Sequence, residues 1–253
     1  MPDFCRYNPQ RPEKAKISIV TIARNEQNTI KETLDSVINQ TEQSLEYIVI
    51  DGSSTDATLK IIIDYKDSID VIISEADDGI YSAMNKAVDL CRGEWILFMN
   101  AGDKLASSRT LEFFDAPDSA GIAYGDARFG DGSGALWKNQ PAEALWRGMI
   151  GSHQSTFVRR ELLKKYRFDE TNRVVADYGL LVRCQSSGAN FHQLNYTISI
   201  IEPGGLSAQR RYRRTWERFK IAFQHYPKLP ISRAYAGIFL GFVWDDLVNM
   251  LNR

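Results

Sequence analysis

The first hundred residues alternate between unbroken apolar runs and segments with apolar residues at helical spacing. A strand buried on both faces of a parallel sheet reads as a continuous run rich in Val and Ile. The pattern predicts four such strands, at residues 17–22, 47–51, 71–74 and 95–100. Between them, apolar residues recur at the three- and four-residue spacing of amphipathic helices. This alternation predicts a Rossmann-like α/β fold with a mostly parallel central sheet and right-handed crossovers.

The rhythm changes after Asp103. Short mixed segments follow, including the Gly-rich residues 125–134, and helical patterns begin at Arg160 and at Asp177. We expect these segments to continue the same sheet with irregular strands rather than to form an independent domain. Residues 208–253 have a helical pattern in which Arg and aromatic side chains alternate before an apolar stretch.

Composition adds a charge asymmetry to this picture. The 253 residues are 43% hydrophobic and 25% charged, which is typical of a globular chain and excludes a disordered or fibrous one. The formal net charge is −1, but the residues from Glu202 onward carry nine Lys and Arg against four Asp and Glu. The result is an acidic body with a basic tail. No nucleic-acid-binding module is recognisable, so no nucleic-acid partner is expected.

Several patterns bear on the cellular compartment. The three cysteines are far apart and form no C-x-x-C pair, which argues against a disulfide framework or a structural zinc site and fits a reducing cytosol. The polar N-terminus does not read as a signal peptide. The apolar stretch Ala234–Trp244 reaches about 16 Å, against roughly 30 Å of bilayer hydrocarbon, so it cannot span a membrane. We therefore expect a cytoplasmic protein whose tail packs in a core or lies on the cytoplasmic face of the inner membrane.

Every predicted strand is followed by a polar segment with a carboxylate. Ligands of open α/β sheets bind at the carboxyl ends of the strands. Carboxylates that converge there repel one another unless a cation lies among them. Alternatively, Asp56 and Asp77 cap helices and residues 100–103 form a tight turn. Neither a G-x-G-x-x-G fingerprint nor a P-loop is present. The four segments are residues 23–26, 51–56, 75–79 and 100–103.

The runs SIVTIARNE, YIVIDGSSTDAT, SEADDGIYSAMNKA and GEWILFMNAGD resemble the N-terminal half of a family 2 glycosyltransferase of the GT-A fold, close to bacterial polysaccharide-assembling members of the colanic-acid type. Residues 152–163, 167–183 and 203–207 match later motifs of the same family. The resemblance implies a GT-A domain over residues 1–207 and a separate basic, helical segment over 208–253. Within the domain it implies an N-terminal extension (1–15), a nucleotide-binding half (about 16–104) and an acceptor half (about 105–207).

The resemblance also implies which residues bind the donor nucleotide. Asp51 would hydrogen-bond the base, although a capping role fits the sequence equally well. Asn85 and Lys86 lie off the apolar stripe of their helix and would face the ribose and diphosphate; a solvated surface lysine is the alternative for Lys86. The implied donor-binding residues are Thr21, Ala23, Glu26, Asp51, Asp77, Asn85, Lys86, Asn100 and Ala101.

Residues 100–103, NAGD, occupy the place of the family's D-x-D metal motif. A divalent cation, Mn²⁺ or Mg²⁺, neutralises the charge that develops on a nucleotide-diphosphate leaving group. The resemblance assigns Asp103 to this metal. Asn100 departs from the two-carboxylate pattern, so one protein charge is missing.

The resemblance further implies an inverting reaction, which needs a base for the acceptor hydroxyl. Asp177 matches the family's base position; the alternative is an N-cap for a helix that begins at Tyr178. His153 and Gln154 match an H-Q pair on the acceptor side. The processive Q-x-x-R-W signature is absent, because Tyr212 stands three residues after Gln209. We therefore expect transfer of a single sugar from a nucleotide-diphosphate sugar to a saccharide acceptor, itself polyprenyl-diphosphate- or lipid-linked, in polysaccharide or lipopolysaccharide assembly.

Other readings stay open at this stage. A sugar-1-phosphate nucleotidyltransferase would need a G-x-G-x-R loop where this chain has ARNE. A receiver-like signalling module with Asp51 as phosphoacceptor would leave the 150 residues after Asp103 unexplained. The basic, aromatic tail is either a solvated face, a peripheral contact with anionic lipid or a lipid-linked acceptor, or the interface of a homo-oligomer.

Overall fold

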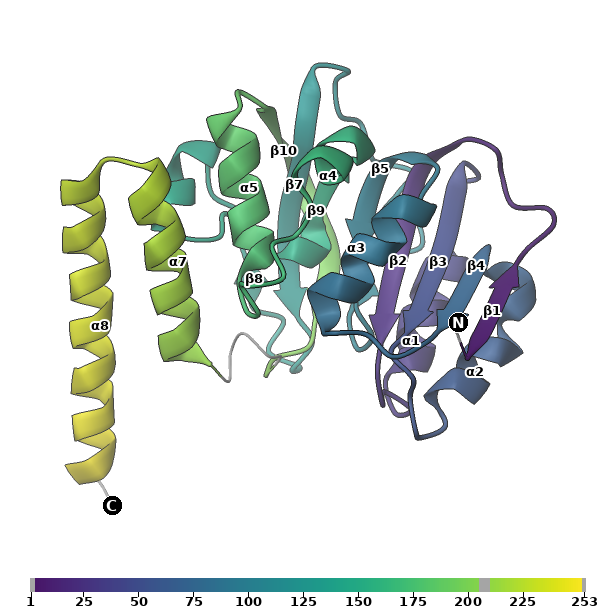
Figure 1. The fold of residues 1–253 in the computed structure, drawn as a ribbon, viewed down its shortest axis with the longest axis horizontal. Helices are drawn as coiled ribbons and strands as arrows, with labels where there is room; N and C mark the ends of the chain where they lie inside the picture. The colour runs from purple at the N-terminus through teal and green to yellow at the C-terminus, as the bar shows by residue number, and fades with distance from the viewer. Residues whose placement is uncertain (1–2, 205–209, 252–253) are drawn as a thin grey trace.

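One mixed sheet organises the molecule, seen in Figure 1 of the computed structural model, which describes residues 3–204 and 210–251. Its strands are ordered β1-β4-β3-β2-β5-β9-β7-β10-β6, and β8 pairs with β7 beside this path. The strands are β1 (Phe4–Tyr7), β2 (Ala15–Ala23), β3 (Leu45–Asp51), β4 (Val71–Ser74), β5 (Gly93–Phe98), β6 (Lys104–Leu105), β7 (Ala120–Phe129), β8 (Leu136–Trp137), β9 (Thr156–Arg159) and β10 (Asn190–Ile201).

Helices cover both faces of this sheet. In Figure 1, α3, α4 and α5 lie in front of the strands, and α1 and α2 lie behind them. The helices are α1 (Ile30–Ile38), α2 (Thr58–Asp64), α3 (Ile80–Leu90), α4 (Arg160–Tyr166), α5 (Ala176–Ser186), α7 (Arg211–His225) and α8 (Lys228–Leu251). Short 3₁₀ turns are η1 (Lys66–Ser68), η2 (Ala142–Arg147) and η3 (His153–Ser155).

The predicted parallel half is confirmed. β4, β3, β2 and β5 are neighbours and run parallel. Successive residues of β2 point to opposite faces: Ile17 and Ile19 join the core under α1 and α2, whereas Val20 and Ile22 join the core under α3 and α5. Because both faces are covered, the strand is apolar at nearly every position. The apolar run therefore has a direct structural cause.

The second half extends the same sheet, as predicted. β9 lies between β5 and β7 and is antiparallel to both, and β10 pairs parallel to β7. The pairing of β10 is interrupted by register shifts between Gln193 and Ser199, which accounts for the weak strand signal in this region. Residues 205–209 lie outside the described residues. They include the end of the 203–207 motif, the predicted domain boundary after Ser207, and Gln209.

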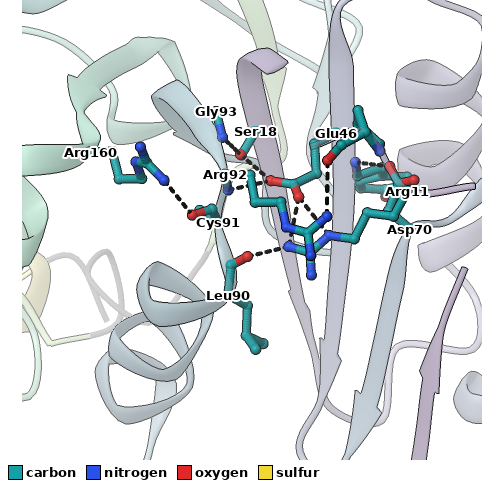
Figure 2. A network of polar contacts seen from close by, with 11 residues as sticks. Arg11, Ser18, Glu46, Asp70, Leu90, Cys91, Arg92, Gly93 and Arg160 are labelled. Atoms are coloured by element: carbon teal, nitrogen blue, oxygen red, sulfur yellow. Dashed lines mark hydrogen bonds and ion pairs between the residues drawn. The ribbon is translucent and has the colours of Figure 1, made fainter. Parts of the chain in front are cut away.

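The N-terminal extension contributes to the sheet in a way that the sequence pattern did not predict. β1 pairs antiparallel with β4 and forms one edge of the sheet. Later in the extension, Arg11 forms an ion pair with Glu46 (Figure 2). Glu46 has no exposed surface. Arg11 Nε donates to Glu46 Oε1 at 2.7 Å, and the backbone N–H of Arg92 donates to Oε2 at 2.8 Å. Ser18 Oγ also donates to Oε2. This network ties the extension to the amino ends of β2, β3 and β5.

We expect Glu46→Ala to destabilise the protein by about 3–5 kcal/mol, because it leaves the nearly buried Arg11 cation without its carboxylate. Urea unfolding followed by circular dichroism measures this loss. Glu32→Ala is the control, since Glu32 pairs with Lys104 at the surface and such pairs contribute little. Equal losses in the two variants would contradict a structural role for the buried network.

The tail forms two helices that stand at the end of the molecule opposite β1 (Figure 1). α7 buries Thr215, Glu217, Ile221 and Ala222, and Glu217 accepts a hydrogen bond from the backbone N–H of Val174 at 3.3 Å. α8 packs on it through Ile231 and Tyr235. Among the helices that the structure describes, none combines the length and the apolar character needed to cross a membrane.

Candidate active site at the carboxyl ends of the strands

The carboxyl ends of β2, β3 and β4 meet at one edge of the sheet. Ala23 pairs with Asp51, and Asp51 pairs with Ser74, so the loops after these strands start side by side. Gly52 marks how closely they approach. A Cβ built on Gly52 would lie 3.0 Å from Asp77 Oδ2 and 3.4 Å from Arg24 Cδ. The structure thus brings Arg24 and Asp77 together across the end of β3.

The backbone of these loops is unusual. Asn25 and Ser53 follow β2 and β3, and both adopt a positive φ, of 56° and 51°. Such a conformation costs free energy for most residues other than glycine, and residues that adopt it occur in tight turns and cluster at functional sites. Asn25 Oδ1 accepts from the backbone N–H of Thr55 at 2.8 Å, which locks the two loops together.

Asp51 is fully buried, and its carboxylate is already occupied. It accepts hydrogen bonds from the Ser54 backbone N–H at 3.0 Å and from Ser74 Oγ at 2.6 Å, and another from Ser54 Oγ. Thr21 also has no exposed surface, and its hydroxyl lies 2.9 Å from the Tyr47 hydroxyl. Both side chains therefore lie beneath the surface and stabilise the strand ends and loops. A bound nucleotide would contact the exposed residues around them before it contacts Asp51 or Thr21.

Other predicted donor-side residues lie nearer the surface. Glu26 is half-buried and accepts from Thr29 Oγ1 at 2.8 Å, while Ala23 is buried at the strand end. Lys86 forms an ion pair with Glu75, and each side chain is about one quarter exposed. This pair keeps the Lys86 ammonium beside the end of β4, where a ligand phosphate could replace the carboxylate.

The N-termini of α2 and α3 bear on the alternative that Asp56 and Asp77 cap helices. The N-cap positions are Ala57 and Gly79, so neither Asp is the N-cap residue itself, but Asp56 Oδ1 accepts from the backbone N–H of Thr58, the first residue of α2, at 2.9 Å. Asp77 Oδ1 instead accepts from the backbone N–H of Gly79 at 3.0 Å and shapes the turn before α3. The turn has Gly79 at φ 124°, a conformation that favours glycine.

Asn85 braces a distant loop. Its amide donates to the Phe168 carbonyl at 2.9 Å and to Glu170 Oε1 at 2.8 Å, and its oxygen accepts from the Phe168 backbone N–H at 2.9 Å. The expectation that Asn85 is free to face a nucleotide is thus not met in this structure, because a nucleotide contact would require these bonds to be exchanged.

The end of β5 presents Asn100, Ala101 and Asp103. Asp103 is 7% exposed and accepts from Gln154 Nε2 at 2.6 Å and from the Glu202 backbone N–H at 3.0 Å. Burial raises the pKa of Asp103 above its usual value, although these two hydrogen bonds and the charge of His153 act in the opposite direction. A cation at this position would relieve the cost of burying the carboxylate.

The donor set at this strand end fits a divalent cation that completes its shell with ligand oxygens. Asn100 Oδ1 is buried and accepts no hydrogen bond from the described part of the chain. Asp103 supplies a buried carboxylate in the same turn, where its backbone N–H donates to the Asn100 carbonyl at 3.0 Å. Across residues 3–204 and 210–251, no group of three or more His, Cys, Asp and Glu side chains is arranged to hold a metal ion. Two protein oxygens suit Mg²⁺ or Mn²⁺ bound together with substrate phosphates rather than a closed protein cage.

His153 connects the end of β5 to α5. Its Nε2 lies 3.3 Å from Asn100 Nδ2, and its Nδ1 lies 3.8 Å from Asp177 Oδ2. When the Asn100 amide donates to Nε2, the proton of the neutral ring sits on Nδ1 and points to Asp177. Side chains from the loop after β5, from η3 and from α5 thus form one line across the site.

Asp177 lies in the first turn of α5, and the helix begins one residue earlier than the pattern predicted. The N-cap is Val175, so the interpretation of Asp177 as an N-cap is wrong. Its Oδ1 accepts from the Tyr178 backbone N–H at 2.8 Å and from the Tyr81 hydroxyl at 3.3 Å. Burial alone would raise the pKa of Asp177, but the His153 hydrogen bond and the charges of His153 and Arg218 outweigh it and hold that pKa below its usual value.

An apolar pocket opens beside this carboxylate. Asp177 and His153 are its charged or titratable lining residues, and Met84, Phe98 and Leu181 contribute to its apolar wall. Thr156 is a third polar residue of the lining, and a largely apolar wall with a few convergent polar groups is typical of a ligand site. Tyr81 and Arg24 were not selected from the sequence. Arg24 lies in the strand-end segment 23–26 but was not singled out within it, and nothing in the local pattern shows that Tyr81 faces the site.

A model of the family described as "Glycosyl transferase family 2" matches residues 18–181 of this chain. A PGL/p-HBAD biosynthesis glycosyltransferase from Mycobacterium bovis is 32% identical over 207 residues, which cover 75% of this chain and 78% of that protein. The residues that match the family model include the strand ends, His153 and Asp177.

Solved structures share the fold. Residues 1–349 of S. aureus TarS, in complex with UDP, superpose with a TM-score of 0.65 at 18% identity, over 88% of this chain and 70% of that one. The mannosyltransferase PcManGT from Pyrobaculum calidifontis, in complex with GDP-Man and Mn²⁺, gives 0.66 at 17% identity, over 89% and 70%. The α/β fold with a mixed central sheet is that of these GT-A proteins.

Proposed function

The chain belongs to glycosyl transferase family 2, and on that premise we propose that it transfers a single sugar, with inversion, from a nucleotide-diphosphate sugar to a saccharide acceptor in cell-surface polysaccharide or lipopolysaccharide assembly. The observation that carries the proposal is the line Asn100–His153–Asp177, which joins the donor end of β5 to an apolar pocket. It supports a donor diphosphate at one end and an acceptor hydroxyl at the other.

The donor would lie over the ends of β2 to β5. Asp77 and Arg24 lie beside Gly52 at the end of β3. Lys86 would bind a donor phosphate in place of Glu75, its present ion-pair partner. Asp51 and Thr21 would hold the loops beneath the nucleoside, with Ala23 and Glu26 at its edge and Asn85 fixing the α3 side. Asn100 and Ala101 would face the diphosphate. UDP and GDP-Man, bound by the two structural neighbours, are the first donor nucleotides to test.

Asp103 and the Asn100 amide oxygen would hold Mn²⁺ or Mg²⁺ together with the diphosphate. When bound, such a cation neutralises charge on the departing nucleoside diphosphate. The bound Mn²⁺ of PcManGT supports this assignment. The protein would contribute two metal ligands at the strand end where the diphosphate would lie: the buried carboxylate of Asp103 and the Asn100 Oδ1 atom, which has no hydrogen-bond partner among the described residues.

Asp177 would act as the base. The acceptor hydroxyl attacks the anomeric carbon while its proton passes to the Asp177 carboxylate; the new bond joins acceptor oxygen to that carbon, and the bond to the donor phosphate oxygen breaks. His153 stands beside the carboxylate, with its Nδ1 3.8 Å from Asp177 Oδ2, and the apolar pocket would exclude competing water. His153 and Gln154 would shape the acceptor side.

The donor assignment is tested by thermal shift with UDP, GDP and dTDP, each with Mn²⁺ and with EDTA. A ligand at 100 times its Kd stabilises the folded state by about 2.7 kcal/mol. We expect one nucleotide to stabilise the protein in the presence of Mn²⁺ and to do so much less in EDTA. Equal, negligible shifts with all three nucleotides would contradict the proposed function.

The tail supports a lipid-linked acceptor at a membrane surface. Leu229, Arg233, Leu240 and Trp244 recur at helical spacing on the side of α8 opposite Ile231 and Tyr235, and the three apolar members are 64%, 71% and 68% exposed. Exposed apolar side chains on a basic helical segment suit the headgroup region of an anionic bilayer.

We expect the protein to float with vesicles that contain phosphatidylglycerol at low salt, because each basic residue near such a surface contributes about 1 kcal/mol. The combined variant Leu229→Ser, Leu240→Ser and Trp244→Ser should stay at the bottom of the gradient. Phe113→Ser is the control, because Phe113 is also an exposed aromatic residue but lies far from α8 in the sequence. Unchanged flotation of the triple variant, or a loss of dimer instead of a loss of flotation, would identify this face as something other than a membrane contact.

A further inference from the structure

The pocket beside Asp177 is unusually apolar for a site that receives a saccharide, a molecule with a hydroxyl on almost every carbon. Its lining includes Phe98, Phe168, Leu180 and Leu181, each at most 6% exposed. The cavity volume is about 20 Å³, which is room for roughly one methyl group or water molecule but not for a hexose ring. A bound sugar ring would therefore stay at the mouth and place one substituent inside.

Contacts within the wall place this cavity next to the carboxylate. The Phe168 ring contacts Tyr81 and Phe98, with ring centres 5.6 Å and 5.3 Å away. Its backbone N–H and carbonyl both bond the Asn85 side chain at 2.9 Å, so Asn85 fixes this part of the wall. The Tyr81 hydroxyl donates to Asp177 Oδ1 at 3.3 Å. A substituent in the cavity must therefore lie close to the hydroxyl that Asp177 would deprotonate.

The polar groups of the lining already have partners. Thr156 Oγ1 donates to the Ser152 carbonyl at 2.8 Å. The His153 ring lies between Asn100 Nδ2 and Asp177 Oδ2, at 3.3 Å and 3.8 Å. Asp177 Oδ1 accepts two hydrogen bonds, which leaves Oδ2 for the attacking hydroxyl. A second hydroxyl in the cavity would compete for that oxygen or lose its bonds to water, at a cost of about 5- to 150-fold in affinity. A methyl group incurs no such cost.

We propose that the acceptor is a 6-deoxyhexose, whose C6 methyl enters this cavity while its 4-hydroxyl meets Asp177. The two groups stand on adjacent ring carbons, as the adjacent cavity and carboxylate require. The new bond joins O4 to the anomeric carbon of the donor, the hydroxyl proton passes to Asp177, and the nucleoside diphosphate leaves. This inference rests on the proposed function and names the class of acceptor sugar. A methyl ether fits less well, because it adds an oxygen to the same space.

The test is saturation-transfer difference NMR of the full chain with matched free sugars. The pairs are 6-deoxy-L-galactose and L-galactose, 6-deoxy-L-mannose and L-mannose, and 6-deoxy-D-glucose and D-glucose, which differ only in the C6 hydroxyl. In at least one pair we expect the 6-deoxy sugar to bind about 5- to 150-fold more tightly, with the strongest saturation on its methyl protons. Equal or tighter binding of the hydroxymethyl sugar in every pair, or no binding of any 6-deoxy sugar, would overturn the proposal.

Met149 provides a matched pair of variants in the cavity wall. It is half-buried, so a polar side chain of the same length can be accommodated. Met149→Gln supplies an amide for a C6 hydroxyl and should lower the preference for the 6-deoxy sugar by about 2- to 10-fold. Met149→Leu keeps the wall apolar and should keep the preference. Melting temperatures check that both variants fold, and an unchanged preference in a folded Met149→Gln would show that the methyl lies elsewhere and overturn the proposal.

Binding is measured without donor, which separates this inference from the proposed base. If Asp177→Asn transfers sugar at the wild-type rate while the 6-deoxy preference and its response to Met149→Gln hold, the base assignment fails and the acceptor cavity stands. If transfer requires Asp177 but no pair shows the preference, the 6-deoxyhexose assignment fails and the proposed function stands.

Discussion

Asp177→Asn is expected to lower the rate of sugar transfer by roughly 10²–10⁴-fold, the usual contribution of a general base. Asparagine keeps the shape of the side chain but cannot take the proton of the acceptor hydroxyl. Donor binding should survive, because Asp177 lies at the acceptor end of the site, beyond His153. The measurement is turnover with the true acceptor, since slow hydrolysis of the sugar nucleotide by water need not use the same base.

The structure allows this variant to fold. An asparagine oxygen can still accept from the Tyr178 backbone N–H and the Tyr81 hydroxyl, which both use Oδ1. The amide nitrogen would replace Oδ2 and face His153, so a modest loss of stability is expected there. Thermal shift with the donor nucleotide therefore serves as the control for an intact donor site.

Transfer at the wild-type rate in Asp177→Asn would place the base elsewhere. Asp169 and Glu170, upstream in the same segment, are the next carboxylates. Each already has a partner in this structure: Asp169 accepts from Thr171 at 2.6 Å, and Glu170 accepts from Asn85 at 2.8 Å. Neither lines the apolar pocket, which favours Asp177 on geometry.

The pH dependence of transfer follows from the same contacts. A carboxylate base works only when ionised, and the pKa of Asp177 lies below its usual value because His153 and Arg218 outweigh the effect of burial. Activity should therefore persist into mildly acidic solution and fall only as the pH drops through that lowered pKa.

The parallel half of the fold was predictable because its signals are local. Ile30, Leu34 and Val37 mark one face of α1 in the sequence, and all three are fully buried in the structure. β1 was missed for the opposite reason. Its four residues alternate between half-buried and exposed, and only the pairing with β4, more than sixty residues away, makes them a strand.

The site divides in the same way. That the loops after β2, β3 and β4 meet follows from the parallel topology, which could be inferred from the apolar runs. The contacts Asn85–Phe168 and Arg218–Tyr178 depend on how α3 and α7 pack against a loop and a helix far along the chain. No spacing in the sequence encodes them. Family membership removes the nucleotidyltransferase and receiver-like alternatives, which the sequence pattern alone had left open.

Asp103→Asn is expected to remove most of the Mn²⁺-dependent stabilisation by the donor nucleotide. The substitution deletes the only carboxylate assigned to the metal, since Asn100 offers a neutral oxygen. Changes to groups that only support a metal's ligands already cost about 10–100-fold in metal affinity, so loss of the ligand itself is expected to weaken binding by about 100-fold. At a nucleotide concentration of 100 times the wild-type Kd, the stabilisation would fall from about 2.7 to about 0.4 kcal/mol. Thermal shift with Mn²⁺ and with EDTA measures both values.

Asparagine is preferable to alanine at this position because Asp103 accepts two hydrogen bonds within a buried environment. Asn keeps one acceptor for the Glu202 backbone N–H or for Gln154, whereas Ala would leave both donors unsatisfied and unfold part of the site. Asp131→Asn is the matched control, because Asp131 is exposed in the loop between β7 and β8 and lies outside the strand ends. If Asp103→Asn responds to nucleotide and Mn²⁺ as the wild type does, the cation is held by other residues, and the correspondence between NAGD and the family's metal motif has no functional meaning in this protein.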